Sequence, residues 1–335
     1  AYEAVDTTLR IFENQKDAVG FLKKLNENFT PSVEEKFSYS FDNGKNEAYA
    51  TNTVLNFPIS TKWSFLGTYQ YRKTENTVTK NSATSNDFKL GAQWQFHSKI
   101  NFNVLVGSSN ARSFVSSYSQ LLVDVFFKIK PLKLQDLEVG YKRDVQNFNA
   151  DLVSREITAN NFYFNYNIVT NFKLGWFTQY FYSTQSDSNQ RNLLFTSLYY
   201  NFLSKPILKA GFNYQFIAFQ KQLPTIYFSP SKFNAYEIFI DFLKDEKSAE
   251  NNTIFYTLIA ATGFQYIEND SKQSTYRVLA KFGYKFSDRF LGNFYGVKSN
   301  IASATAAGFQ YTEVGLRLGW MLTSKPVFTV KKNDK

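Results

Sequence analysis

The sequence predicts an all-β protein: a closed antiparallel transmembrane β-barrel of about 16 strands with a short N-terminal periplasmic helix. Phe, Tyr and Trp make up 19% of the 335 residues, and such residues favour strands. The mean hydropathy is nevertheless −0.36, which indicates that apolar residues alternate with polar ones. Segments of roughly 8–14 residues repeat this alternation along the chain, and that is the length of strands in a tilted membrane barrel.

The composition limits the kinds of chemical site that the chain can form. The chain has no Cys and one His, so we expect no disulfide, no metal site and no cofactor. The single imidazole, His97, falls in a predicted turn, which argues against a Ser-His-Asp site and against an enzyme. The formal net charge of +10 would suit an anionic partner. The basic residues are scattered, however, so we expect no nucleic acid partner.

Residues 1–32 carry a helical pattern. Apolar residues recur at helical spacing at Val5, Leu9, Phe12, Val19 and Leu22. Asp6 could cap the helix, and Thr30-Pro31 ends it. We expect a periplasmic helix here, followed by a barrel over residues 33–322 and a periplasmic tail over residues 323–335.

The barrel segments alternate with a period of two. In "DFKLGAQWQF" one face carries Phe88, Leu90, Ala92, Trp94 and Phe96, and the other carries Asp87, Lys89 and Gln93. Such apolar faces recur with no second layer to cover them, so we expect lipid to cover them. Backbone groups in lipid must all be paired, which requires a closed sheet. A large soluble β-sandwich or solenoid remains the alternative.

The connections alternate in length as well. Short ones such as "HSK" and "SDR" are separated by longer polar ones such as "TENTVTKNSATSN", "QNFNADLVSR" and "QLPTIYFSP". Outer-membrane barrels place short turns in the periplasm and long loops outside. We therefore expect an integral protein of the bacterial outer membrane with both termini in the periplasm.

The stretch "NAYEIFIDF" illustrates the expected faces. As a strand it directs Tyr236, Ile238 and Ile240 to lipid, and Glu237, Phe239 and Asp241 to a polar lumen. The same phasing predicts a lumen path that consists of Asp124, Lys128, Tyr163, Tyr199, Glu237, Phe239, Asp241, Arg277, Lys281, Glu313 and Arg317, with Phe195 and Tyr311 also inward.

Two chemical interpretations of this lumen stay open. Glu237 and Asp241 lie about 13 Å apart along the strand, too far for a glycosidase pair, so we expect them to form ion pairs with lumen Lys and Arg. The inward rings could pack against an internal plug or loop, or they could form stacking surfaces for sugar rings.

One stretch resembles a known family. "IYFSPSKFNAYEIFIDF" contains Tyr227, Phe228, Ser229, Pro230 and Phe233 in a pattern similar to a loop of tetratricopeptide-linked exopolysaccharide export porins, such as the barrel encoded in the cellulose synthase operon. "FGYKFSDRFLGNFYGVKSN" and "YTEVGLRLGW" resemble their closing strands, and "FTPSVEEKFSYSFDNG" resembles their first barrel strand. The resemblance covers about a third of the chain.

The resemblance implies a passive porin that exports an exopolysaccharide, with Tyr227, Phe228, Ser229 and Pro230 in an extracellular gate loop. It also implies that the N-terminal helix ends a helical-repeat scaffold. Outer-membrane lipid and the exopolysaccharide in transit are the expected partners, with periplasmic or inner-membrane synthase components or other outer-membrane subunits as further candidates. The alternatives are a non-transporting barrel subunit of a secretion or insertion machine, and a general diffusion porin whose basic residues favour anions.

Overall fold

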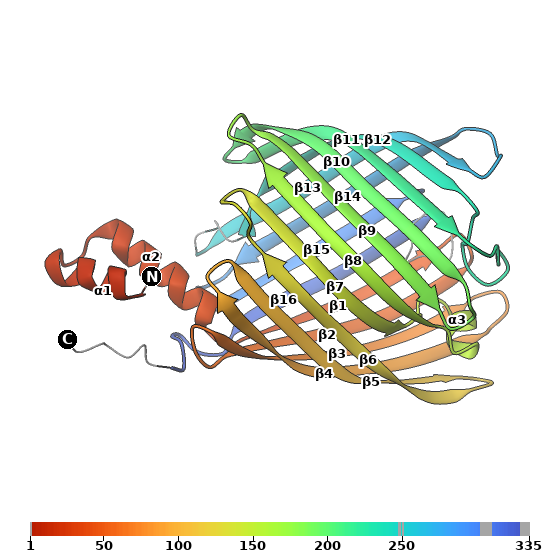
Figure 1. Ribbon diagram of the computed structural model, residues 1–335, viewed down its shortest axis with the longest axis horizontal. Helices are drawn as coiled ribbons and strands as arrows, with labels where there is room; N and C mark the ends of the chain where they lie inside the picture. Colours follow the sequence, from red (N-terminus) through yellow and green to blue (C-terminus); the bar gives the residue numbers. More distant parts are fainter. Residues whose placement is uncertain (1, 247–248, 250, 302–309, 329–335) are drawn as a thin grey trace.

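The computed structural model describes residues 2–246, 249, 251–301 and 310–328. Sixteen antiparallel strands close into one barrel, which confirms the predicted fold class (Figure 1). The strands are β1 Ser32–Asp42, β2 Asn46–Pro58, β3 Trp63–Asn76, β4 Ser82–His97, β5 Ile100–Ser113, β6 Ser117–Ile129, β7 Gln135–Val145, β8 Thr158–Val169, β9 Leu174–Gln185, β10 Gln190–Ser204, β11 Ile207–Phe219, β12 Phe233–Lys244, β13 Thr253–Ile267, β14 Gln273–Lys285, β15 Phe290–Ser299 and β16 Tyr311–Met321.

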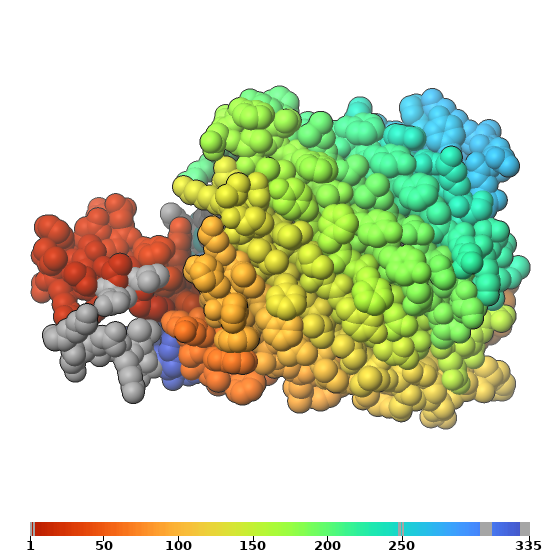
Figure 2. Space-filling model, in the orientation of Figure 1, coloured from red at the N-terminus to blue at the C-terminus, as the bar shows by residue number. Residues whose placement is uncertain are grey.

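Pairing between the first and last strands closes the barrel. β1 and β16 run antiparallel in continuous register, from Ser32 opposite Met321 to Asp42 opposite Tyr311. This pairing leaves the sheet without a free edge, so the strand backbones can cross lipid fully hydrogen-bonded. In the space-filling view the side chains of neighbouring strands pack into a continuous outer wall (Figure 2).

The two faces of the wall differ as the alternation predicts. On β12 the outward Tyr236, Ile238 and Ile240 are exposed, whereas Glu237 and Asp241 on the inner face are buried. Exposed large apolar side chains recur on the outer face of the other strands, including Phe65, Leu90, Phe212 and Phe294. A solvent-exposed apolar band of this extent is stable only when lipid covers it.

The N-terminal region forms two helices where the sequence predicts one. α1 spans Tyr2–Ile11 and α2 spans Lys16–Phe29. The chain reverses at Asn14, whose φ of 65° lies in the left-handed region, and the side chain of Gln15 accepts a hydrogen bond from the amide of Ala18. The Tyr2 hydroxyl donates to Asn26, so the helices form an antiparallel hairpin. None of the described helices is long and apolar enough to cross a membrane.

The barrel has two distinct ends. We call the end that carries α1 and α2 the helix end, and the opposite end, which carries the short helix α3 (Ala150–Ser154), the loop end (Figure 1). At the helix end the residues after β16 lie beside α2: the Leu322 amide donates to the carbonyl of Pro31, and the Phe328 ring packs against Phe29. Residues 329–335 of the predicted tail lie outside the described residues.

Several strands continue into segments that the sequence predicts as loops. The predicted loop over residues 74–86 is largely strand, because β3 reaches Asn76 and β4 starts at Ser82. Polar residues pair as strands here because hydrogen bonding to a neighbouring strand does not depend on side-chain polarity. The barrel therefore extends at the loop end beyond its apolar band.

Candidate functional site

Two chain segments fold into the barrel at the loop end. Residues 146–157, which contain α3, connect β7 to β8, and residues 220–232 connect β11 to β12. We call these two segments together the plug. Leu152 of α3 is completely buried in an apolar cluster with Ile217, Phe233 and other inward residues of β10–β13. Val153 packs into a second cluster with Ala83 of β4 and Ala111 of β5. The plug thus contacts strands on both sides of the barrel opening at the loop end, β10–β13 on one side and β4–β5 on the other.

Polar contacts hold the α3 segment against the β3–β4 wall. Arg72 donates from Nε to the carbonyl of Asn147 at 3.0 Å. Asn147 in turn donates to the hydroxyl of Ser85 at 2.8 Å, and Asn81 donates to the carboxylate of Asp151 at 2.5 Å. Three hydrogen bonds between the β3–β4 region and the plug therefore fix the position of the α3 segment along the barrel axis at the loop end.

Asn149 joins the two halves of the plug. Its side-chain oxygen accepts from the amide of Leu152 at 2.8 Å and so caps α3. Its side-chain nitrogen donates to the carbonyl of Ile226 at 3.0 Å. One buried amide therefore stabilises the short helix and connects it to the other half.

The predicted gate residues lie within the second half of the plug. Tyr227 is only 3% exposed, and its hydroxyl lies 2.7 Å from Oε1 of Gln185 and 2.9 Å from Oδ2 of Asp187 while it accepts from Asn189. Burial raises the pKa of Tyr227 above its ordinary value, so this hydroxyl stays protonated.

The neighbouring gate residues complete the fold of this segment. Phe228 packs edge-on against Phe233, and Ser229 accepts from the amide of Leu223 at 2.6 Å. Pro230 is buried, and its carbonyl accepts from the amide of Phe219. The segment is therefore a compact packed unit.

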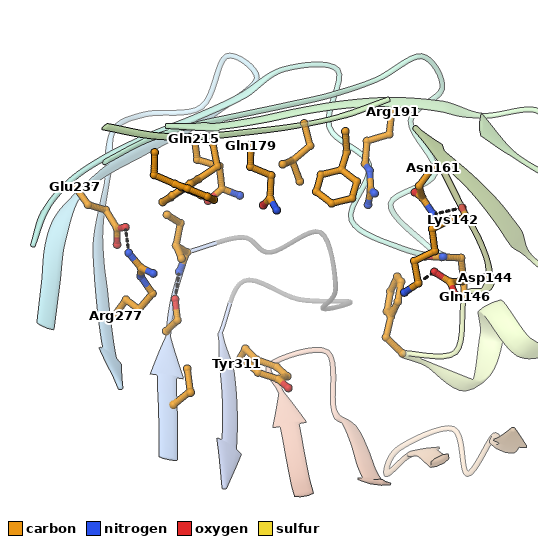
Figure 3. A pocket seen from close by; sticks show the side chains of 18 residues that line it. Lys142, Asp144, Gln146, Asn161, Gln179, Arg191, Gln215, Glu237, Arg277 and Tyr311 are labelled. Carbon is orange, nitrogen blue, oxygen red and sulfur yellow. Dashed lines mark hydrogen bonds and ion pairs between the residues drawn. The ribbon is translucent and has the colours of Figure 1, made fainter. Parts of the chain in front are cut away.

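Beneath the plug lies a cavity of about 650 Å³ in the lumen (Figure 3). The plug contributes Gln146 and Phe148 to its lining. The walls contribute four aromatic rings, three amides and two ion pairs, namely Phe177, Phe181, Phe195, Tyr311, Asn161, Gln179, Gln215, Lys142 with Asp144, and Glu237 with Arg277. Phe177 also lines a second cavity of about 450 Å³, together with Lys128 and Glu138.

Inward rings pack against one another along β8, β9 and β10. Tyr163 stacks on Phe181 with centroids 5.3 Å apart and planes at 22°, and Phe177 contacts Phe195 at 6.1 Å. Tyr199 crosses a neighbouring strand to donate to Asn167 at 3.2 Å. This crossing requires Gly175, because a Cβ there would lie 2.2 Å from the Tyr199 ring.

The predicted carboxylates form ion pairs with inward cations. Glu237, 2% exposed, lies 3.0 Å from Arg277, and Asp241 lies 3.0 Å from Lys209. Asp124 pairs with Lys89 at 3.9 Å. Burying unpaired charge is costly, and these pairs reduce that cost. The inner face is therefore charge-compensated rather than uniformly basic.

The other predicted lumen residues also lie on the inner face. Glu313 accepts from Lys36 at 3.0 Å and from the hydroxyls of Tyr295 and Tyr311. Arg317 bridges Glu34 at 2.5 Å and Glu246 at 2.7 Å. Lys128 lies over the ring of Phe126 and 3.7 Å from Glu138.

Phe239 and Lys281 point inward from β12 and β14. Within the described part of the chain, neither belongs to an ion pair or an aromatic pair. The structure thus groups the predicted residues into several separate pairs along the lumen instead of one centre.

The α3 segment was not predicted as a functional element, because the sequence "QNFNADLVSR" is typical of an ordinary polar loop. A signal was present: Asn149 precedes the helix-forming residues Ala150 to Val153, as expected of an N-cap. Lys142, Asp144, Phe177 and Phe181 were not predicted as lumen residues either. His97 is exposed at the end of β4, and no group of three metal-ligating side chains occurs among the described residues.

Comparison with known proteins gives a likeness of fold. No family model matches the chain, and no curated protein matches it. Among solved structures it is similar to a bacterial polysaccharide outer membrane secretin, with a TM-score of 0.69 at 10% identity over 88% of this chain and 99% of that chain. It is also similar to CdiB from Acinetobacter baumannii, with a TM-score of 0.52 at 8% identity over 87% of this chain and 60% of that chain.

Proposed function

We propose that this protein is an outer-membrane porin through which an exopolysaccharide leaves the cell, without catalysis. The apolar outer band fits a membrane, and the outer membrane is where bacterial barrels of this kind reside. The solved structure with the TM-score of 0.69 is a polysaccharide outer membrane secretin, which supports the same assignment for this chain.

The lining of the lumen carries the proposal. Phe177, Phe181 and Phe195 present rings to a cavity that also contains the side-chain amides of Gln179 and Gln215. Aromatic faces and amides together suit a sugar chain, whose C–H faces pack on rings and whose hydroxyls exchange hydrogen bonds with amides. A pore for small ions alone would have no need of inward rings.

In this proposal the helix end faces the periplasm and the plug closes the outer mouth. The polymer enters at the helix end, passes the two cavities and displaces the plug. Tyr227 and Phe228 belong to the displaced half, so they act in gating through the packing of the whole segment.

A second candidate is a structural subunit of a larger outer-membrane assembly. The hairpin α1–α2 favours it, because Ile11, Phe12 and Phe21 are exposed at 66%, 62% and 48%. An antiparallel helix pair with uncovered apolar residues is also the geometry of one unit in a helical-repeat scaffold. Both candidates place a protein partner at the helix end, and a synthase component is the partner we propose there.

Planar-bilayer conductance of the full chain tests the proposal. We expect low conductance, brief openings and further reduction when oligosaccharide is added. Tyr227→Ala with Phe228→Ala should lengthen the openings because it removes buried contacts of the plug. A barrel that shows neither openings in this variant nor any response to oligosaccharide would favour the structural subunit.

A further inference from the structure

Resting on the proposed function, we infer that the polymer is an uncharged, hydroxyl-rich polysaccharide, and that the cavity beneath the plug binds a short length of it. The net charge of +10 suggests at first a path for a polyanion. The distribution of charge on the inner face leads to the opposite conclusion.

Cations that line the cavity are largely neutralised by carboxylates. Lys142 lies 2.8 Å from Asp144, and Arg277 lies 3.0 Å from Glu237. The remaining cation, Arg191, donates to the hydroxyl of Ser183 at 3.0 Å. A polyanion would have to compete with these bound carboxylates, which lowers the net gain from each contact.

Ion pairs also neutralise cations of the lumen that lie nearer the helix end. Lys209 pairs with Asp241 at 3.0 Å, Lys36 with Glu313 at 3.0 Å, and Lys128 with Glu138 at 3.7 Å. Arg317 lies between two carboxylates. No continuous stripe of one sign runs through the described part of the lumen, so neither a polyanion nor a polycation is guided along it.

Uncharged contacts are abundant instead. Phe177, Phe181 and Phe195 line the cavity with rings, and Asn161, Gln179 and Gln215 line it with side-chain amides. Two of these amides also hydrogen-bond within the wall, since Gln179 donates to Asn165 and Asn161 accepts from Ser183. Rings, amides and paired carboxylates together match a neutral sugar chain.

Isothermal titration calorimetry on the full chain in detergent tests the inference with three hexasaccharides: a neutral glucan, a polyuronate and a glucosamine oligomer. We expect the glucan to bind at least about tenfold more tightly than either charged hexamer, with an affinity that changes little with salt. Phe195→Ala should weaken glucan binding without creating a preference for charge.

Asp144→Asn provides the matched electrostatic variant, because it leaves Lys142 without its carboxylate. This variant should gain affinity for the polyuronate by about tenfold at low salt and lose the gain at high salt. Tighter binding of the polyuronate or the glucosamine oligomer by the unaltered protein would overturn the inference while leaving polysaccharide export intact. Absence of binding by all three hexamers would overturn both.

Discussion

At the scale of single residues, the direction of a side chain on its strand determines its environment. Ile238 and Glu237 are neighbours in sequence, yet Ile238 is 64% exposed on the outer face and Glu237 is buried on the inner face. Alternation alone predicts this difference, because successive side chains on a strand point to opposite sides.

Ile238→Lys should therefore destabilise the barrel by roughly 2–4 kcal/mol, as expected for a charge on the lipid face near mid-membrane. Ile238→Leu should have little effect, since it keeps an apolar side chain of the same size. Folding into lipid vesicles, followed by urea titration, measures the free energy of unfolding. A harmless Ile238→Lys would show that this face does not contact lipid.

The partners of the inward charges could not be predicted from the sequence. Glu237 on β12 reaches Arg277 on β14 across β13, where Ala261 and Gly263 leave room between them. This contact depends on the registers of two successive strand pairs, which alternation does not determine. The sequence therefore indicated which residues face inward and that the carboxylates pair with cations, and the structure was needed to show which cation each one contacts.

At the scale of elements, the plug is the feature that local sequence patterns did not predict. Its α3 segment has five helical residues, too short for a periodic signal, and its stability comes from tertiary burial of Leu152 and Val153. The helix and strand patterns describe the wall, whereas the plug depends on contacts between distant parts of the chain.

Asn149→Ala should loosen the plug, because it removes the cap of α3 and the hydrogen bond to Ile226. The loss of the cap is worth about 0.5–2 kcal/mol. We expect a several-fold rise in the fraction of time spent open in planar bilayers. Asn171→Ala, at an exposed turn of the helix end, is the control and should leave the traces unchanged. Identical gating in both variants would contradict a role for Asn149.

The attachment of α2 to the rim should depend on pH. Lys23 lies 2.5 Å from Asp288 in the β14–β15 turn, and this contact lowers the pKa of Asp288 below its ordinary value. A carboxyl with a lowered folded pKa contributes stability above its unfolded pKa, and the contribution is lost as pH falls through the folded pKa. A second rim contact joins Glu27 of α2 to Lys285 at 3.9 Å.

Proteolysis of the hairpin should therefore accelerate as the pH is lowered from neutral to below the ordinary pKa of Asp. Asp288→Asn should already be cleaved faster at neutral pH and should show a smaller pH response. Asp270→Asn, in a loop at the opposite end, is the control and should behave as the unaltered protein. Equal pH responses in all three proteins would show that Asp288 does not hold the hairpin.

At the scale of the whole molecule, closure joins β1 and β16, which lie at opposite ends of the barrel sequence. Pairing strands so far apart is slow and late in folding, because loop-closure entropy is lost before the contacts form. Close packing between β1 and β16, which we call the seam, is therefore required for the barrel to close. The fit is tightest at Gly315, where an added Cβ would lie 2.5 Å from the backbone oxygen of Phe37 and 2.4 Å from the hydroxyl of Tyr295.

Gly315→Val should prevent proper closure, because the Phe37 carbonyl belongs to the adjacent strand and cannot move aside without disturbing the pairing. Gly296→Val on β15 is the matched control: an added Cβ there meets nothing closer than 3.9 Å, and the position faces outward. Closed barrels resist detergent until heated, so electrophoresis with and without boiling measures closure. We expect the faster-migrating unheated band for the unaltered protein and Gly296→Val, and its loss for Gly315→Val. A heat-modifiable band of normal intensity in Gly315→Val would mean that the seam can widen to accept a side chain, and that closure tolerates a looser register than the structure displays.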